Sequence, residues 1–135
     1  MSLYRERKTK INDVRALEDS LKQKGFTPVR HSEAVPLEGY MGDKRKDTAE
    51  VIIPRKQVGR ASNDIGFKRQ EDGSFAAIIS DFDKTHGYGD AWVKEIIGLA
   101  TEAKAMRVVK KLDLEQIGRT ELPNGKIRLQ FTQRG

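Results

Sequence analysis

The stretch NDIGFKRQEDGSFAAIISD, residues 63–81, decides the fold class. In its first half, apolar Ile65 and Phe67 alternate with polar residues or glycine, which is the period of a strand with one buried face. An Asp-Gly pair ending at Gly73 predicts a tight turn, because glycine tolerates the positive φ that the turn needs. Residues 74–80 are apolar on both alternating faces. The stretch therefore predicts a hairpin whose second strand is covered on both sides of a sheet.

Two amphipathic segments on either side of this hairpin predict helices. The first begins after a cap at Asn12 or Asp13, repeats apolar residues at helical spacing and ends at Gly25, where a left-handed residue belongs. The second covers Ala91–Lys111 and begins after Asp90, a good N-cap. Each helix has one apolar stripe, so each should pack on the sheet.

The remaining segments predict strands and loops. Strands are expected over residues 3–11, 26–35 (an edge strand, because of Pro28), 35–42, 49–53, 114–122 and 126–132. Residues 43–48 predict a basic loop, and residues 55–62 a mobile one. Long antiparallel runs with only two helices indicate the α+β class. We expect residues 1–135 to form a single α+β domain, with a mostly antiparallel sheet and two helices packed on one face.

The composition excludes several classes of protein. A chain of 135 residues is long enough for one domain with a real core, and it contains no run of about 20 apolar residues that could cross a membrane. Without cysteine it cannot have disulfides, thiolate metal sites or cysteine nucleophiles. Its 26 Lys and Arg against 20 Asp and Glu give a net charge of +6. That charge favours polyanionic partners, although many soluble domains are equally basic.

One short segment carries a possible metal site. Asp81, Asp83 and His86 follow the buried strand, and loops beyond strand ends often present ligands. The competing interpretation is that the two carboxylates and the imidazole are solvated loop residues. Because the chain has only two histidines and no Glu-x-x-His pattern, we treat these residues as weak candidates and predict no metal and no cofactor. No nucleophile arrangement is visible, so we expect no enzyme activity.

Basic residues form three groups that are candidates for binding a partner. The groups are Lys44, Arg45 and Lys46 in the expected loop, Lys104, Arg107 and Lys111 on one face of the second helix, and Lys126 and Arg128 on the wet side of the last strand. If the three groups join, they form one footprint for a polyanion. If they do not, they are separate solvated faces, and few exposed aromatics are available for stacking on bases.

Several motifs together resemble a known family. They are KTKIND (8–13), EGYMG (38–42), AEVII (49–53), NDIGF (63–67) and GKIRL (125–129). In this order they resemble the hypothetical chloroplast reading-frame thirty-five family, a domain of unknown function from algal plastids, cyanobacteria and some other bacteria. The resemblance spans nearly the whole chain and implies a small intracellular domain, in the cytoplasm or, in an alga, in the plastid stroma. That family has no established activity, cofactor or catalytic residues to carry over.

We therefore expect a non-enzymatic binding or adaptor module that acts through a basic surface on a protein partner, without membrane attachment. The alternative is a protein that binds RNA or DNA through backbone phosphates. A metal-dependent enzyme is a distant third hypothesis.

Overall fold

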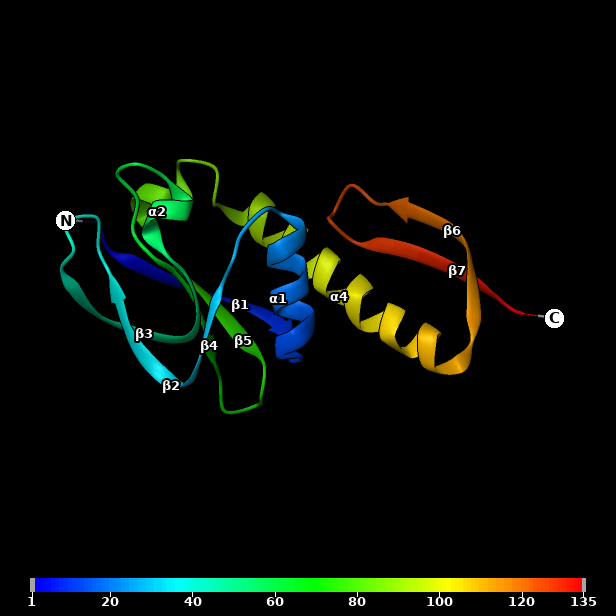
Figure 1. Ribbon diagram of the computed structural model, residues 1–135. Coiled ribbons are helices and arrows are strands. Elements are labelled where there is room, and N and C mark those ends of the chain that lie inside the picture. The colour runs from blue at the N-terminus through cyan, green and yellow to red at the C-terminus, as the bar shows by residue number, and fades with distance from the viewer. Residues whose placement is uncertain (1, 135) are drawn as a thin grey trace.

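The computed structural model describes residues 2–134 (Figure 1). Its elements are, in chain order, β1 (Tyr4–Ile11), α1 (Val14–Gln23), β2 (Val29–Glu38), β3 (Lys44–Ile53), α2 (Arg55–Val58), β4 (Ile65–Arg69), β5 (Phe75–Ser80), α3 (Asp81–Lys84), α4 (Asp90–Leu112), β6 (Leu114–Glu121) and β7 (Ile127–Gln133). The chain is an α+β domain, as the sequence predicts.

Five antiparallel strands form the main sheet in the order β1-β5-β4-β3-β2. The predicted central hairpin is present as β4 and β5, and the turn closes with the Gln70 amide donating to the Ser74 carbonyl at 2.7 Å. Gly73 has a φ of +86°, the left-handed conformation for which glycine is suited. All six residues of β5 are buried, so this strand is covered on both faces. β2 lies at an edge of the sheet, as Pro28 led us to expect.

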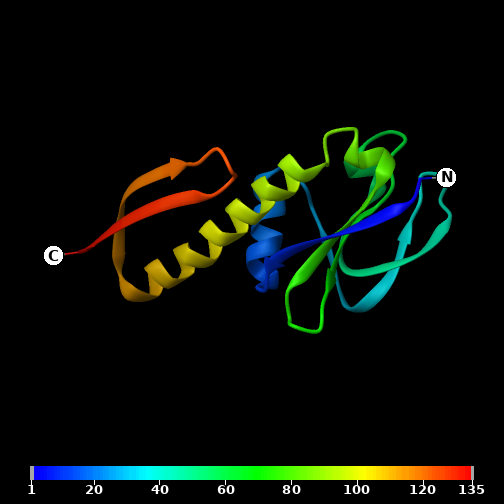
Figure 2. The ribbon, with the colours of Figure 1, turned by 180° about the vertical axis from the view of Figure 1, so that it is seen from behind.

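Helices α1 and α4 cover one face of this sheet, which confirms the predicted arrangement (Figures 1 and 2). Leu17 and Leu21 of α1 and Ile96 of α4 are fully buried against Phe67 of the central strand. Asp13 caps α1, because its Oδ1 accepts from the Ala16 amide at 3.0 Å. This interface holds the larger hydrophobic core.

The opposite face is covered by the sheet itself. The start of β3 reaches the N-terminal segment, where Arg45 stacks over the Tyr4 ring at 5.0 Å and donates to the Ser2 carbonyl. A second core cluster of Leu37, Ala49, Ile52 and Ile78 lies inside this curl. Gly66 lets the side chain of Ala49 pack directly on the backbone of β4, because a Cβ added at position 66 would lie 2.6 Å from the Cβ of Ala49. A sheet that curls over its own face needs no third layer there.

The last two strands form a separate two-stranded sheet beside the end of α4 that lies away from the main sheet (Figure 2). Ile127, Leu129 and Phe131 of β7 are half-buried, and the intervening residues are exposed. The hairpin tip docks where Gly125 meets Gly98 of α4, and a side chain at position 98 would overlap the Gly125 carbonyl. The hairpin is therefore supported on one face only.

Several local predictions are wrong. The two strands expected over residues 26–35 and 35–42 are the single strand β2, which ends at Glu38. The basic residues 44–46 belong to β3 instead of a loop, because Lys44 pairs with Glu38 across the β2–β3 hairpin. Residues 55–58 form the short helix α2, whose first amide, that of Arg55, donates to the Asp64 carboxylate at 2.7 Å. Gly89 takes the N-cap position of α4, and Asp90 is its first residue.

Candidate functional site

A buried polar hub forms where two of the quoted motifs, EGYMG and NDIGF, meet. The Asp64 carboxylate accepts from the Glu38 amide at 2.8 Å and from the Arg55 amide at 2.7 Å. The Asn63 side chain accepts from the Tyr40 amide at 2.9 Å, and Tyr4 donates its hydroxyl to the Asp64 carbonyl. Burial, reinforced by the negative charge of Asp64, raises the pKa of the Tyr4 phenol. These bonds tie β1, β2, α2 and β4 together, so the hub is a structural junction.

The three candidate metal ligands have separate environments. Asp83 is fully buried, and its Oδ2 accepts from the Ser80 hydroxyl at 2.7 Å and from the Asn63 amide at 3.1 Å. Asp81 pairs with Arg5 at 3.1 Å. His86 stacks on the Phe82 ring, with its Nδ1 2.6 Å from the Phe82 carbonyl oxygen. Among residues 2–134, no group of three or more His, Asp or Glu side chains is placed to hold a metal ion.

The three basic groups do not form one surface. Lys44, Arg45 and Lys46 lie on β3, toward the opposite end of the molecule from the β6–β7 hairpin (Figures 1 and 2). Arg45 has little exposure and is held by Tyr4 and Ser2, which leaves Lys44 and Lys46 exposed. A single ligand of ordinary size cannot bridge β3 and the hairpin.

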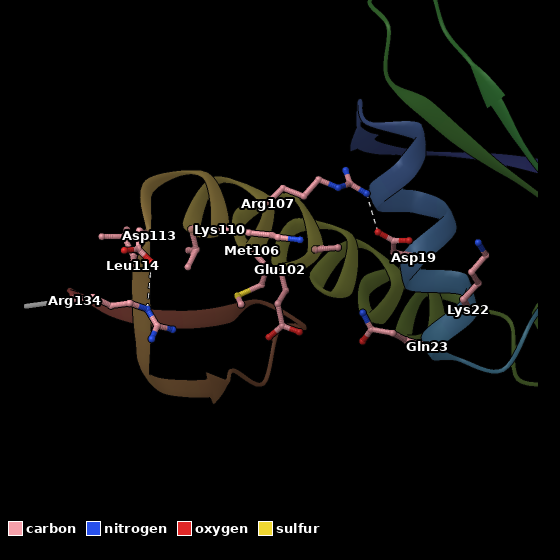
Figure 3. Close-up of a pocket in the computed structure, with 12 residues that line it drawn as sticks. Asp19, Lys22, Gln23, Glu102, Met106, Arg107, Lys110, Asp113, Leu114 and Arg134 are labelled. Carbon is pink, nitrogen blue, oxygen red and sulfur yellow. Dashed lines mark hydrogen bonds and ion pairs between the residues drawn. The ribbon is translucent and has the colours of Figure 1, made fainter.

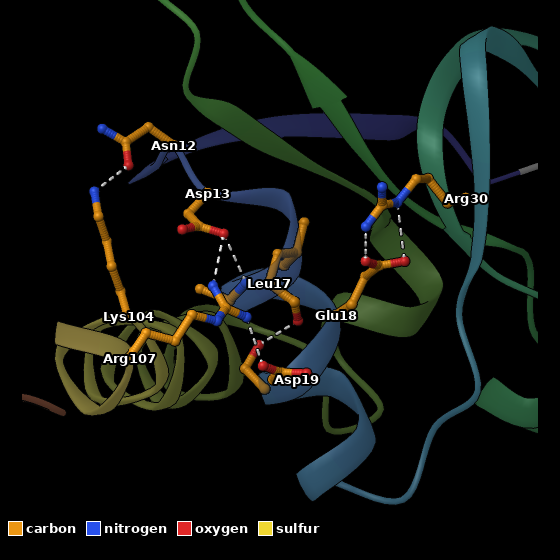
Figure 4. A network of polar contacts seen from close by, with 10 residues as sticks. Asn12, Asp13, Leu17, Glu18, Asp19, Arg30, Lys104 and Arg107 are labelled. Atoms are coloured by element: carbon orange, nitrogen blue, oxygen red, sulfur yellow. Dashed lines mark hydrogen bonds and ion pairs between the residues drawn. The ribbon is translucent and has the colours of Figure 1, made fainter. Parts of the chain in front are cut away.

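Two of the three predicted basic residues of α4 bind side chains of α1 or of the segment before it (Figure 4). Arg107 donates to Asp13 at 3.1 Å and to Asp19 at 2.7 Å, so its guanidinium crosses between the two helices. Lys104 donates to the side chain of Asn12 at 2.8 Å. Lys111 is exposed near the end of the helix. Arg107, which the sequence predicts to contact a partner, therefore links α1 to α4 through ion pairs.

The titration of Asp13 reflects this bond. Burial by itself would raise the pKa of the Asp13 carboxyl, but hydrogen bonds from the Ala16 amide and from Arg107 together lower it. The carboxylate is thus ionised and paired near neutral pH. The pairing joins the N-terminus of α1 to the far half of α4.

Lys126 and Arg128 lie on the hairpin and are exposed. They alternate with Ile127 and Leu129, whose side chains pack toward α4, so the two cations face away from that helix. They are therefore separated from Lys104 and Arg107, which face α1. The alternating pattern predicted that these side chains are solvent-exposed. It could not predict that the hairpin forms a sheet separate from the main one.

A groove between α1, the second half of α4 and the start of β6 is the candidate site (Figure 3). It has a volume of about 760 Å³. Ala103, Met106 and Val109 of α4 and Leu114 of β6 supply its apolar surface. The rim residues are Asp19, Lys22 and Gln23 of α1, Glu102, Arg107 and Lys110 of α4, and Asp113 and Arg134 beyond it.

Most rim charges are already paired. Asp19 binds Arg107, Asp113 lies 3.5 Å from Arg134, and Glu102 pairs with Arg119. Within the part of the chain that the structure describes, Lys22 and Lys110 have no carboxylate within ion-pair distance. The groove consequently has an apolar floor and an excess of positive charge at its rim.

Further apolar side chains are exposed at this end of the molecule, although they do not line the groove. Met106 is 38% exposed in the groove, and Val108, Leu112 and Ile117 are 52%, 59% and 63% exposed around the turn from α4 into β6. Single exposed apolar residues are ordinary on protein surfaces. Four within twelve residues of chain concentrate apolar surface at one end of the molecule.

The sequence analysis did not identify Met106, Lys22 and Lys110 as site residues. Helix length was the available signal. A helix of 23 residues is about 35 Å long, whereas the six residues of β5 span about 20 Å. The second half of α4 extends beyond the main sheet (Figure 2), so its apolar residues need other neighbours.

These features define a small α+β domain whose candidate site is an open groove between helices, with a hairpin as one wall. The chain belongs to the family described as "Protein of unknown function (DUF1257)", whose model matches residues 20–129. Membership of an uncharacterised family is what the motifs led us to expect. No curated protein and no solved structure matches the chain. No helix within residues 2–134 is both long and apolar enough to span a bilayer.

Proposed function

We propose that this protein is a non-enzymatic binding module that docks a partner protein in the groove between α1 and α4. The observation that carries the proposal is the partly exposed Met106 on an apolar floor edged by Lys22 and Lys110, which have no carboxylate partner among residues 2–134. Protein interfaces commonly combine an apolar centre with a polar rim, and methionine is enriched in them. Of the basic residues expected from the sequence to bind a partner, only Arg107 lines this groove in the described part of the chain.

Nucleic-acid binding is less well supported. A phosphate-binding surface needs several free cations on one face, with aromatic side chains where single strands are bound. Arg107 is occupied by Asp13 and Asp19, and the other basic groups lie on different faces. The groove itself has no aromatic lining residue among those the structure describes.

Paired methionine substitutions test the proposal. Met106→Asp places a charge on the groove floor, whereas Met41→Asp makes the same change at the β2–β3 turn, where Met41 is 74% exposed. The three immobilised proteins are incubated with a lysate of the cells that produce the chain. A partner should bind wild type and Met41→Asp and be lost from Met106→Asp, and the purified partner should show the same order in direct titration.

Equal capture by all three proteins would contradict the groove as the site. A parallel shift assay with RNA and DNA addresses the alternative. Lys110→Gln with Lys111→Gln leaves the Arg107 ion pairs intact and keeps good helix formers. Tight wild-type binding at physiological salt, lost in this double variant with a shallower salt dependence, would favour nucleic acid.

A further inference from the structure

We infer that the segment bound in the groove is an amphipathic helix with acidic residues flanking its apolar stripe. This inference rests on the proposed function and names the chemistry of the partner. It follows from three features of the groove: the spacing of its floor residues, its length and its charge.

The floor has the spacing that a helix packs against. Ala103, Met106 and Val109 are three residues apart on α4 and form one ridge of side chains, in which Met106 is 38% exposed, Ala103 is partly buried and Val109 is buried. Ridges at this spacing fit between the ridges of a second helix, and the small Ala103 beside the larger Met106 supplies a hollow and a knob. A flat apolar surface would carry no such preference.

The length of the groove limits the occupant. Its lining residues on and just beyond α4 run from Glu102 to Asp113, which corresponds to about 16 Å of helix. Residues of α1 bound one end, and Asp113 and Leu114 bound the other (Figure 3). About three turns of helix fit between these limits.

The charge selects the flanking residues of the occupant. Lys22 stands on α1 and Lys110 on α4, and each lacks a carboxylate partner among residues 2–134. The acidic rim residues Asp19, Glu102 and Asp113 are already paired with arginines. An incoming helix with glutamates beside its apolar stripe would supply the missing partners, and a lysine-flanked helix would be repelled.

A charge-swap experiment tests this directly. The probes are two fluorescein-labelled 14-residue peptides with leucines at i, i+3, i+4 and i+7, one flanked by glutamates and the other, otherwise identical, by lysines. Binding is measured by anisotropy. Wild type should prefer the glutamate peptide. Lys22→Glu with Lys110→Glu should weaken that peptide about tenfold and reverse the preference. Both lysines are exposed but lie in the last turns of α1 and α4, so this variant should fold and melt slightly below wild type.

The matched control reverses two exposed lysines elsewhere, Lys46→Glu with Lys56→Glu, and should leave the preference unchanged. Met106→Asp should weaken both peptides. Circular dichroism of the bound glutamate peptide should show helix. Failure of wild type to bind either peptide, equal binding of both, an extended bound conformation, or the same reversal in the control would overturn the inference.

The two proposals fail in different ways. If Met106→Asp abolishes capture of the natural partner but no peptide preference exists, the groove binds protein and only the acidic helix is wrong. If Met106→Asp leaves capture intact, the groove is not the site, whatever the peptides do.

Discussion

β5 and β7 are both strands that follow a tight turn, but β5 is apolar on both faces whereas β7 is apolar only at alternate positions, and the two strands have different surroundings. β5 lies between β1 and β4, with the helices on one face and the curled start of β3 on the other, and all its residues are buried. β7 has β6 as its single neighbour and α4 on one face, and none of its residues is fully buried. In both strands the apolar pattern matches the number of covering layers, which is two for β5 and one for β7.

The same difference separates the two ends of the protein. The main sheet buries its polar hub, and most polar atoms of the hub have hydrogen-bond partners within the protein. The α4–hairpin end leaves Met106, Val108, Leu112 and Ile117 partly exposed. Two-stranded sheets are marginal by themselves, so the hairpin depends on α4. We therefore expect mutations at the two ends to differ in size and in kind.

The largest effect should come from identical substitutions in the two sheets. Ile78→Asp puts a charge among Leu37, Ala49 and Ile52 and should lower the free energy of unfolding by about 3–5 kcal/mol. Ile117→Asp changes a side chain that is mostly exposed and should cost less than about 0.5 kcal/mol. Urea denaturation of both variants measures this difference. Equal losses would show that burial does not distinguish the two sheets.

A smaller effect is expected at the polar hub. Asp64→Asn keeps the shape of the side chain but removes one of the two oxygens that accept from the Glu38 and Arg55 amides. Leaving a buried amide unpaired should cost about 1–3 kcal/mol. Thermal unfolding is compared with Glu71→Gln, an exposed change in the β4–β5 turn. If the two variants melt together, the hub contributes little to stability.

The contact between hairpin and helix predicts a local effect. In Gly98→Ala the new methyl meets the Gly125 carbonyl, at a cost of about 1–3 kcal/mol, partly offset by about 1 kcal/mol of helix propensity. Amide hydrogen exchange should accelerate in β6 and β7 and stay unchanged in β4 and β5. Thr101→Ala, exposed on the same helix, is the control. Uniform acceleration throughout the chain would show that the hairpin and the main sheet unfold as one unit.

The smallest effect concerns the bond from α4 to α1. Asn is as good an N-cap as Asp, so Asp13→Asn removes the charge that Arg107 binds while keeping the cap. Because the pKa of Asp13 is lowered in the folded state, its contribution is present above the unfolded pKa of about 4 and is lost as pH falls through the folded value. Wild type should exceed the variant by about 0.5–1 kcal/mol at pH 7, and the difference should vanish in acid. A difference independent of pH would exclude the ion pair as its cause.

Local patterns predicted much of the main fold. The β4–β5 hairpin follows from alternation and one turn, and α1 follows from its cap and from the Gly25 stop. These features depend on residues close together in sequence, where period and backbone preference act directly. The α+β class and the edge position of β2 follow from the same kind of information.

Long-range contacts account for what the local patterns missed. Residues 44–46 look like a basic loop but form a strand, because β2 and the N-terminal segment supply partners. Asp83 looks like a solvated or metal-binding residue but is buried against Asn63 and Ser80. Arg45 is held by Ser2 and Asp83 by Asn63, and each of these partners is distant in sequence. Local sequence patterns cannot predict such partners.

The sequence alone determined the charge, most of the main-sheet strands and long helices, and the uncharacterised family of this protein. Only the tertiary structure decided which cations remain available. Arg107, a free cation in sequence, is occupied because α1 crosses α4 and brings Asp13 and Asp19 to it. Lys110, three residues further on, has no carboxylate partner among residues 2–134 and lines a groove beside the half of α4 that extends beyond the main sheet. Pairing energy depends on distances in space, and those distances are set by packing instead of by sequence spacing.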